Sequence, residues 1–272
     1  MYLSNSWNVI TVGDGDLSFS QALLKKCPGI HVCATVLDSE HQLRAKYKDN
    51  AIDSLKNAQQ SIVYGVDIIR PDSFTNRLQN RFDLAIFQFP LVPNAGPRRP
   101  GQSWHQGNDS NLMNRKLLHA FLQNAAKLFL SPEGARLCYI TSKDVKPYCD
   151  WNIEALGNDH NGQPSPMEYI GQMPFNPNEF PGYRIRNVDR DKQVKSTAAI
   201  TYVWTDNTNQ PLSKTLQKPN FASDEYCQLC GVGPIQTAKD WQAHLNSRLH
   251  KRRLNYQLQW ENYLAGSNTN NL

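Results

Sequence analysis

The sequence predicts an α/β protein built on a doubly wound, mostly parallel sheet, followed by a small C-terminal metal-binding module. Three observations support this prediction. Short β-rich runs alternate with segments of helical periodicity between residues 7 and 205, as in parallel sheets with crossover helices. Four of these runs end at Gly, Asp or Pro, which terminate strands. Two cysteines and two histidines near the C-terminus have the spacing of metal ligands.

The predicted elements follow this alternation from the N-terminus. Strands are expected at residues 7–12, 31–37, 61–66, 82–89, 135–141 and 196–204, the last one a candidate antiparallel edge strand. Helices are expected at residues 17–24, 40–57, 111–130 and 151–156. Residues 91–111 form a Pro- and Gly-rich loop of the length found in active-site lids, and residues 157–181 are also expected to be loop-rich.

The length of 272 residues suits one large domain with a small appendage. We expect a main domain at residues 1–205, a linker at 206–223, a finger with an amphipathic helix at 224–264 and a flexible tail at 265–272. Hydrophobic residues make up 39% of the chain, which is enough for a core. The net charge of +5 permits a polyanionic partner but does not require one.

Nothing in the sequence indicates membrane insertion or secretion. No run approaches the roughly 18 apolar residues of a membrane helix, and residues 1–10 lack the basic and apolar regions of a signal peptide. Cys27, Cys33, Cys138 and Cys149 are scattered through mixed segments, which is typical of reduced thiols. We therefore expect an intracellular protein without a membrane partner, in the nucleus or nucleolus of a eukaryote or the cytoplasm of a bacterium.

A ligand site is predicted where the first strand ends. Open α/β sheets bind ligands beyond the carboxyl ends of their strands, and this end carries the turn Gly13-Asp14-Gly15-Asp16. Glycines let the backbone approach a ligand closely, and free amides can face it. Asp38, which ends the second strand, can accept hydrogen bonds from both ribose hydroxyls, and Asp67, which ends the third, can accept one from an adenine amino group.

The expected ligand therefore carries adenosine. A dinucleotide fingerprint requires a third glycine at the position of Ser18, so NAD is disfavoured and S-adenosylmethionine (SAM) is preferred. The alternative is purely structural. In that interpretation Gly13 and Gly15 only form a tight turn, and Asp38 and Asp67 cap helices.

These residues belong to a longer series of motifs that resembles the ribosomal RNA uridine-N3 methyltransferases of the large subunit. The series covers about residues 7–190 and consists of Val12-Gly13-Asp14-Gly15-Asp16-Leu17-Ser18-Phe19-Ser20, Leu37-Asp38-Ser39, Lys46-Tyr47, Tyr64-Gly65-Val66-Asp67, Phe82-Asp83, Phe87-Gln88-Phe89-Pro90, Pro147-Tyr148, Trp151 and Pro181-Gly182-Tyr183. The resemblance implies a Rossmann-like fold of the SAM-methyltransferase type, SAM as methyl donor and an RNA base as acceptor. The cofactor site that it implies consists of Gly13, Asp14, Gly15, Asp16, Ser18, Phe19, Ser20, Asp38, Ser39 and Asp67.

The resemblance places the acceptor site at the end of the fourth strand, at Gln88, Phe89 and Pro90. The family usually has Phe-Asn-Phe-Pro-His there, whereas this chain has Gln88 in place of the Asn and Leu91 in place of the His. Gln88 keeps the amide on a longer stem, but Leu91 cannot form a hydrogen bond. Because a sulfonium is already an activated methyl donor, in-line placement of the acceptor atom would supply much of the rate.

The C-terminal module carries the most specific local motif. Cys227, Cys230, His244 and His250 supply two thiolates and two imidazoles, which tetrahedral zinc prefers. Because the histidines are six residues apart, the helix that carries them must distort or end between them. The wide His spacing resembles matrin-type and double-stranded-RNA-binding zinc fingers. A domain this small cannot bury enough apolar surface to fold without its metal.

A basic run begins inside the finger and continues beyond it. Its residues are Arg248, Lys251, Arg252 and Arg253. Beside a nucleic-acid-type finger we expect phosphate contacts from these side chains, and the alternative is a solvated helix face. The residues that could extend this track are Arg98, Arg99, Arg184, Arg186 and Arg190. The apolar positions of residues 254–263 are expected to pack on the main domain.

Three functions are compatible with these motifs. The first, which we expect, is a SAM-dependent methyltransferase acting on an RNA base, at a ring nitrogen such as uridine N3 in structured or ribosomal RNA, with the zinc finger helping to hold the RNA. The second is a methyltransferase-like RNA-binding protein with altered catalysis, suggested by Gln88 and Leu91. The third is a SAM-dependent enzyme for a small molecule or a protein, with the finger used for protein contacts.

Overall fold

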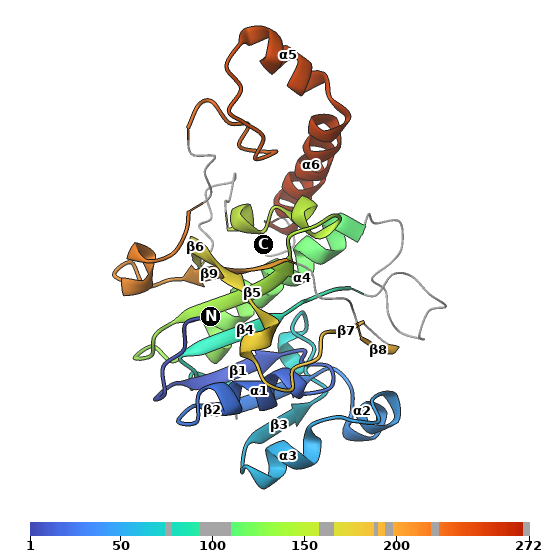
Figure 1. The fold of residues 1–272 in the computed structure, drawn as a ribbon, viewed down its shortest axis with the longest axis vertical. Helices are drawn as coiled ribbons and strands as arrows, with labels where there is room; N and C mark the ends of the chain where they lie inside the picture. Colours follow the sequence, from blue (N-terminus) through green and yellow to red (C-terminus); the bar gives the residue numbers. More distant parts are fainter. Residues whose placement is uncertain are drawn as a thin grey trace.

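A seven-stranded sheet lies at the centre of the main domain, in the order β3-β2-β1-β4-β5-β9-β6 (Figure 1). The computed structural model describes residues 1–73, 78–92, 110–157, 166–187, 190–193, 198–218 and 223–268. The strands of the sheet are β1 (Asn8–Val12), β2 (His31–Val36), β3 (Ser61–Tyr64), β4 (Leu84–Gln88), β5 (Leu137–Lys143), β6 (Glu168–Phe175) and β9 (Ala199–Thr205). Strands β1 to β5 pair in parallel, and β9 is antiparallel to both of its neighbours. The predicted doubly wound, mostly parallel sheet is confirmed.

Helices cover both faces of this sheet. They are α1 (Ser18–Lys26), α2 (Glu40–Lys46), α3 (Ile52–Asn57), α4 (Ser110–Asn124), the π-helical turn η3 (Ala125–Phe129) and α6 (Arg248–Asn268), whereas α5 (Ala238–Asn246) lies away from the sheet (Figure 1). Alternate strand residues point to opposite faces. Ile10 and Ala85 pack on the side of α4 and α6, while Val9 and Leu84 pack on the side of α1. Such two-sided burial is typical of a parallel sheet.

Shorter elements complete the fold. They are η1 (Pro71–Ser73), η4 (Tyr148–Trp151), η5 (Ile153–Ala155), η6 (Pro177–Glu179), η7 (Pro211–Lys214) and the two-stranded ribbon of β7 (Arg186–Asn187) and β8 (Arg190–Gln193). The helix predicted at residues 151–156 does not form. This segment contains the end of the 3₁₀ turn η4 and all of the 3₁₀ turn η5 instead. Asn152, with φ +48°, interrupts the backbone between these 3₁₀ turns.

The strand order reverses between β1 and β4. The chain adds β2 and β3 on one side of β1 and then crosses to its other side to form β4. The carboxyl end of β1 carries the glycine turn, and that of β4 carries Gln88. The two predicted halves of the site therefore meet at the switch point of the sheet, where α/β folds bind ligands.

Three sequence predictions about regular elements are wrong. The helix over residues 40–57 is two helices, because Tyr47 has an extended backbone that ends α2. The last strand, β9, lies between β5 and β6 and is not an edge. The edge strand is β6, within a region expected to be loop-rich, where Gly171 and Pro174 obscure the strand pattern; edge strands tolerate proline.

The segment predicted as a linker, residues 206–223, packs partly on the main domain. Leu212 of η7 is buried, and Gln217 pairs with Gln172 of β6. Helix α6 continues to Asn268, into the predicted flexible tail. Residues 93–109 of the predicted long loop, including Arg98 and Arg99, lie outside the described residues. Within the described part of the chain, no helix is both long and apolar enough to cross a membrane.

Candidate functional site

The turn after β1 depends on two residues with positive φ angles. Gly13 has φ +63° and Leu17 has φ +66°, which bend the chain from the strand into α1. A Cβ atom on Gly13 would also lie 3.0 Å from the ring of Phe87 in β4. Glycine is therefore favoured at this position both by the backbone angle and by the close packing of two neighbouring strands.

The two acids of the turn bind the start of α1. The Asp14 carboxylate accepts hydrogen bonds from Ser20 N (2.7 Å) and Ser20 Oγ (2.6 Å), and Asp16 accepts one from Ser18 N (3.0 Å). Both acids are buried. Burial, reinforced by the nearby Asp16 carboxylate, raises the pKa of Asp14 to about 7. These four predicted cofactor residues thus bind one another and fix the shape of the turn.

The connection between α2 and α3 covers the glycine turn. A Cβ atom on Gly15 would lie 3.2 Å from the hydroxyl of Tyr47, whose side chain is buried. Ala51 N donates a hydrogen bond to the carbonyl of Asp16 at 2.9 Å. The sequence predicted that Gly15 makes room for a ligand, but in this structure it makes room for Tyr47.

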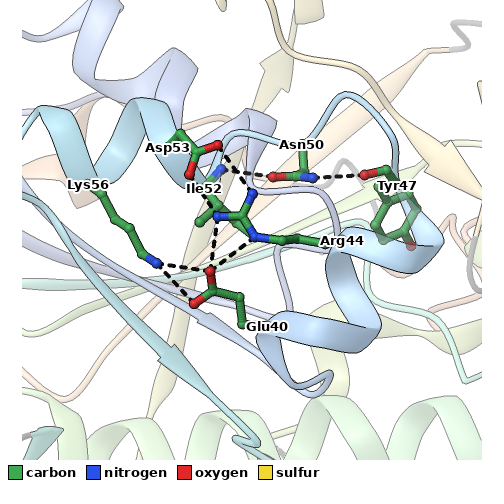
Figure 2. Close-up of polar contacts among 7 residues, drawn as sticks. All are labelled: Glu40, Arg44, Tyr47, Asn50, Ile52, Asp53 and Lys56. Carbon is green, nitrogen blue, oxygen red and sulfur yellow. Dashed lines mark hydrogen bonds and ion pairs between the residues drawn. The ribbon is translucent and has the colours of Figure 1, made fainter.

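An ion-pair network joins α2 to α3 on the outside of this cover (Figure 2). Arg44 Nη2 lies 2.7 Å from Asp53 and 3.0 Å from Glu40, and Lys56 Nζ lies 2.9 Å from the same Glu40 oxygen. Because residues 40–57 read as one continuous helix in the sequence, neither this network nor the position of Tyr47 over the site was predicted.

The acids at the ends of β2 and β3 also have partners. Lys46 Nζ lies 2.5 Å from the Asp38 carboxylate. Ser39, predicted as a cofactor residue, caps α2 by accepting a hydrogen bond from Gln42 N. Asp67 accepts a hydrogen bond from Ile69 N at 3.1 Å and closes a local turn. The structural alternative had Asp38 and Asp67 as helix caps, whereas Ser39 caps α2, Asp38 pairs with Lys46 and Asp67 closes a turn.

An open apolar surface lies between these two acids. Leu37, which follows β2, is 55% exposed, and the pairing register places it next to Gly65. A Cβ atom on Gly65 would meet no atom within 4 Å. An exposed leucine beside open space, with Asp38 and Asp67 adjacent in sequence to these positions, fits the apolar face and the polar edges of an adenosine.

At the end of β4, Gln88 is buried, and within the described part of the chain neither Oε1 nor Nε2 of its amide forms a hydrogen bond of good geometry. The hydroxyl of Tyr183 lies close to Gln88, Asp14 and Asp16, and burial of this hydroxyl raises the pKa of Tyr183 well above its usual value. Buried amides without partners are rare because their desolvation is uncompensated. Gln88 is therefore the predicted site residue whose hydrogen bonds a ligand could complete.

The two other predicted acceptor residues continue from Gln88. Phe89 has φ +49° and packs edge-on against Phe175 with ring centroids 5.7 Å apart. Pro90 is buried. Phe19, predicted as a cofactor residue, is fully buried with its ring centroid 5.1 Å from that of Tyr183. Aromatic packing thus fixes the path of the chain on both sides of Gln88.

The segment after β6 brings two arginines to the glycine turn. Arg186 Nε lies 2.7 Å from Asp16 Oδ2, and both Arg184 and Arg186 pair with Asp49. That these arginines extend a phosphate-binding track stays a prediction, and in this structure both pair with acids of the chain. No local pattern could reveal the Arg186–Asp16 pair, because 170 positions separate its members. The side chain of Arg190 lies outside the described residues.

The four predicted metal ligands come together. The ligand atoms of Cys227, Cys230, His244 and His250 all lie within 4.8 Å of one another. His250 Nδ1 is 3.5 Å from each cysteine sulfur, close to the roughly 3.6 Å that tetrahedral zinc–ligand distances require. His244 Nε2 is buried without a partner. The convergence of two thiols and two imidazoles fits a zinc ion.

The predicted helix break between the two histidines is confirmed. Helix α5 ends at Asn246, and α6 begins at Arg248. Ser247 between them has an extended backbone, and its Oγ accepts a hydrogen bond from His250 N at 3.2 Å. This break turns the chain, so that both rings face the same pair of sulfurs.

The basic run divides into two parts. Arg252 and Arg253 each lie 3.1 Å from the carboxylate of Asp150. Contacts of these two side chains with RNA phosphates stay a prediction. Arg248 and Lys251 are exposed. The predicted packing of the following helix on the main domain is confirmed at Trp260, which is fully buried.

Comparison with known proteins gives the family. The family model described as BMT5-like, rRNA (uridine-N3-)-methyltransferase BTM5-like, matches residues 10–187. The chain belongs to the BMT5-like family. It is a SAM-dependent RNA methyltransferase, as the motifs predicted. The Cys2His2 module of this BMT5-like protein lies beyond the matched residues.

Two plant relatives share the body of the BMT5-like chain. An uncharacterized protein of Arabidopsis thaliana is 30% identical over 189 residues, covering 67% of this chain and 82% of the relative. Heavy metal-associated isoprenylated plant protein 41 of the same species is 28% identical over 193 residues, covering 69% of this chain. The chain spans only 34% of that second relative.

Solved structures resemble the BMT5-like chain more distantly. The TehB-like SAM-dependent methyltransferase of Corynebacterium glutamicum has 16% identity and a TM-score of 0.37, and the match covers 75% of this chain and 83% of that one. The 30S ribosomal A1408 methyltransferase of an uncultured bacterium has 10% identity and a TM-score of 0.39, with coverages of 75% and 95%.

Proposed function

We propose that this BMT5-like protein transfers the methyl group of SAM to N3 of a uridine in structured RNA, with ribosomal RNA as the expected class. In this proposal residues 1–205 form the catalytic body. Residues 224–264 form a zinc finger that helps to hold the RNA, and residues 206–223 connect the two. The observation that carries the proposal is the buried amide of Gln88 at the end of β4, whose polar atoms form no hydrogen bond of good geometry with the described residues. The description of the family supports the choice of acceptor atom.

The carboxyl edge of β1, β2 and β3 would hold SAM. Asp38 would accept hydrogen bonds from the ribose hydroxyls while it shares its carboxylate with Lys46. The surface of Leu37 and Gly65 would receive the adenine, with Asp67 near its amino group. SAM supplies a methyl group already activated on a sulfonium. The task of the protein is therefore to place an acceptor nitrogen in line with that group.

Gln88 would orient the acceptor base. Its Nε2 can donate a hydrogen bond to a carbonyl oxygen adjacent to N3 of uracil, which leaves the nitrogen itself free to react. The N3 proton of uracil is lost near a pH of about 9 to 10 in water, and a donor to the adjacent oxygen stabilises the anion that forms. Phe89 and Pro90 would offer apolar surface to the base.

The Cys2His2 module would bind zinc with all four side chains. Two sulfurs and two nitrogens fill a tetrahedral zinc ion, so this zinc would have a structural role and no open position for catalysis. The zinc would supply the folding free energy that a module of this size lacks. The exposed Arg248 and Lys251 would then face RNA phosphates from a fixed helix.

The test is methyl transfer from SAM labelled in its methyl group to ribosomal RNA, followed by digestion and mass spectrometry of the nucleosides. Labelled 3-methyluridine should form with the wild type. It should fall by about 100-fold with Gln88→Ala, because the orienting amide is lost. Gln88→Asn, which restores the amide usual in the family, should keep most of the activity. Tight SAM binding with no label in RNA, or label on a different atom, would overturn the proposal.

A further inference from the structure

A buried carboxylate joins the finger to the catalytic body. Asp150 lies in η4, beyond the end of β5, and its side chain is 7% exposed. Arg253 Nε lies 3.1 Å from Asp150 Oδ1, and Arg252 Nη2 lies 3.1 Å from Asp150 Oδ2. Arg253 thus donates a hydrogen bond to one carboxylate oxygen, and Arg252 forms an ion pair with the other without hydrogen-bond geometry. We refer to Asp150, Arg252 and Arg253 as the clasp.

The clasp also reaches the metal module itself. Arg253 Nη1 donates a hydrogen bond to the carbonyl of Leu229, between the two cysteines, at 3.3 Å. Arg253 Nη2 donates to the carbonyl of Cys149 at 2.9 Å. From the other side, Asn111 of α4 donates to the carbonyl of Asp150 at 2.7 Å. The guanidinium of Arg253 therefore bridges the cysteine turn and the loop after β5. Helix α4 binds the same loop through Asn111.

A second anchor fixes α6 about two turns beyond the clasp, at Trp260. The guanidinium of Arg115 in α4 lies 4.8 Å from the ring centroid of Trp260, and Lys116 Nζ lies 4.2 Å from that of Tyr263. Figure 1 shows α6 running from the finger back to α4. Arg253 and Trp260 are seven residues apart, about 10 Å along a helix, so the two anchors together oppose a pivot of the finger about either one.

The clasp lies on the route from the acceptor site to the finger. The loop that carries Asp150 begins at the carboxyl end of β5, the neighbour of β4, where Gln88 lies. Two exposed lysines lie close in sequence to clasp residues, Lys146 before Asp150 and Lys251 before Arg252. This arrangement offers positive charge to an RNA backbone that runs between the acceptor site and the finger.

We propose that Asp150 is a positioning residue for methyl transfer. Through the clasp it fixes the Cys2His2 module relative to Gln88, so that the protein selects an acceptor base by its spacing from an RNA stem held by the finger. This inference rests on the proposed function. The substrate that it names is a stem with the acceptor in an adjoining loop or bulge, because a base stacked in a duplex cannot reach a buried amide.

The experiment uses the full-length, zinc-loaded protein and a ladder of stem-loop RNAs in which the distance from the stem to a single uridine grows by one nucleotide at a time. The wild type should favour one distance by at least about tenfold in kcat/KM, and Asp150→Asn should reduce that preference below about twofold. Hydrogen exchange of the amides at 227–230 and 249–253 should become faster in this variant. Zinc content and SAM affinity should not change.

Asp206→Asn is the matched control. Asp206 pairs with Arg136 at the amino end of β5, the end opposite to the loop that carries Asp150. Asp206→Asn should leave both the distance preference and the exchange unchanged. A retained preference in Asp150→Asn would overturn the inference. If that variant fails to fold or loses zinc, Arg253→Lys replaces it, because lysine keeps the charge but lacks the planar guanidinium that reaches the three acceptors. This variant should also lose the preference for one stem-to-uridine distance, and a retained preference would show that the inference is wrong. A wild type that methylates every ladder member equally overturns the inference alone, whereas one that binds SAM but methylates no RNA overturns the proposed function as well.

Discussion

The finger and the glycine-turn site use their predicted ligand residues in opposite ways. In the finger, the ligand atoms of four predicted side chains converge within 4.8 Å of one another. At the glycine turn, most predicted acids already bind the protein, as Asp16 binds Arg186 and Asp38 binds Lys46. A motif of fixed local spacing therefore predicts the ligating atoms themselves. A motif based on sheet topology predicts only where a ligand binds, and tertiary contacts decide which atoms remain available.

The two regions also differ in what stabilises them. The body buries apolar side chains on both faces of its sheet. Helix α5, by contrast, buries none of its residues, and Leu245 on it is 42% exposed. We expect the body to fold through its core and the finger to fold through its metal.

The largest expected effect is the loss of zinc. Cys227→Ser should abolish stoichiometric zinc binding and unfold the finger, because structural zinc sites contribute about 10 kcal/mol or more to small domains. The body should keep its melting temperature within a few degrees. Metal analysis and limited proteolysis measure these two effects. Cys149→Ser, outside the ligand group, should behave as the wild type, and a zinc-bound, protease-resistant Cys227→Ser protein would contradict the comparison.

The next largest effect concerns Asp38, which pairs with Lys46 and is also proposed to bind the ribose of SAM. Asp38→Ala should weaken SAM binding by about 1–3 kcal/mol, because the ribose hydroxyls lose their acceptor. Lys46→Met removes the same ion pair but keeps the carboxylate, so it should weaken SAM binding far less. Calorimetry of both variants separates the two tasks. Equal SAM affinity in both variants would mean that Asp38 serves only Lys46.

A smaller effect should appear as a pH dependence of stability. The pKa of Asp14 is about 7 in the folded protein, above the ordinary value of 3.8, so the folded state holds an extra proton between these values. This stabilisation is complete below pH 3.8 and is lost as the pH rises to about 7.

Asp14→Asn should remove the pH-dependent contribution of this carboxyl group to the free energy of unfolding. Between pH 5 and pH 7.5 the wild type should therefore lose more unfolding free energy than the variant, by an amount on the order of 1 kcal/mol. Urea titrations at the two pH values measure the difference. Parallel pH dependences of the two proteins would show that Asp14 is not held protonated in the fold.

Features that depend on residues close in sequence could be predicted, and contacts between residues far apart in sequence could not. The parallel strands, their order of appearance and the four metal ligands could be predicted, because each depends on residues close in sequence. The Arg253–Asp150 contact could not, since its members are 103 positions apart. The end of α2 at Tyr47 was also missed, because no glycine or proline marks it. The helix ends where Tyr47 packs over Gly15, which is a tertiary contact without a local signal.

The smallest expected effect concerns the exposed ion pairs of Arg44 with Asp53 and Glu40. Arg44 joins Asp53 and Glu40 with the same chemistry as Arg253 and Asp150, but the Asp53 side chain is 72% exposed, against 7% for Asp150. Water and salt screen exposed pairs, and ordering two long side chains offsets much of their attraction. Arg44→Met should therefore change the melting temperature by less than about 2 °C in low salt and not at all in high salt.

Calorimetry at both salt concentrations measures the melting temperatures of Arg44→Met and of Arg253→Lys, so that the two ion pairs can be compared directly. If the two variants melt alike, burial is not what distinguishes the clasp from the network. A large, salt-independent loss in Arg253→Lys alone would show that the low exposure of Asp150 gives the clasp its strength.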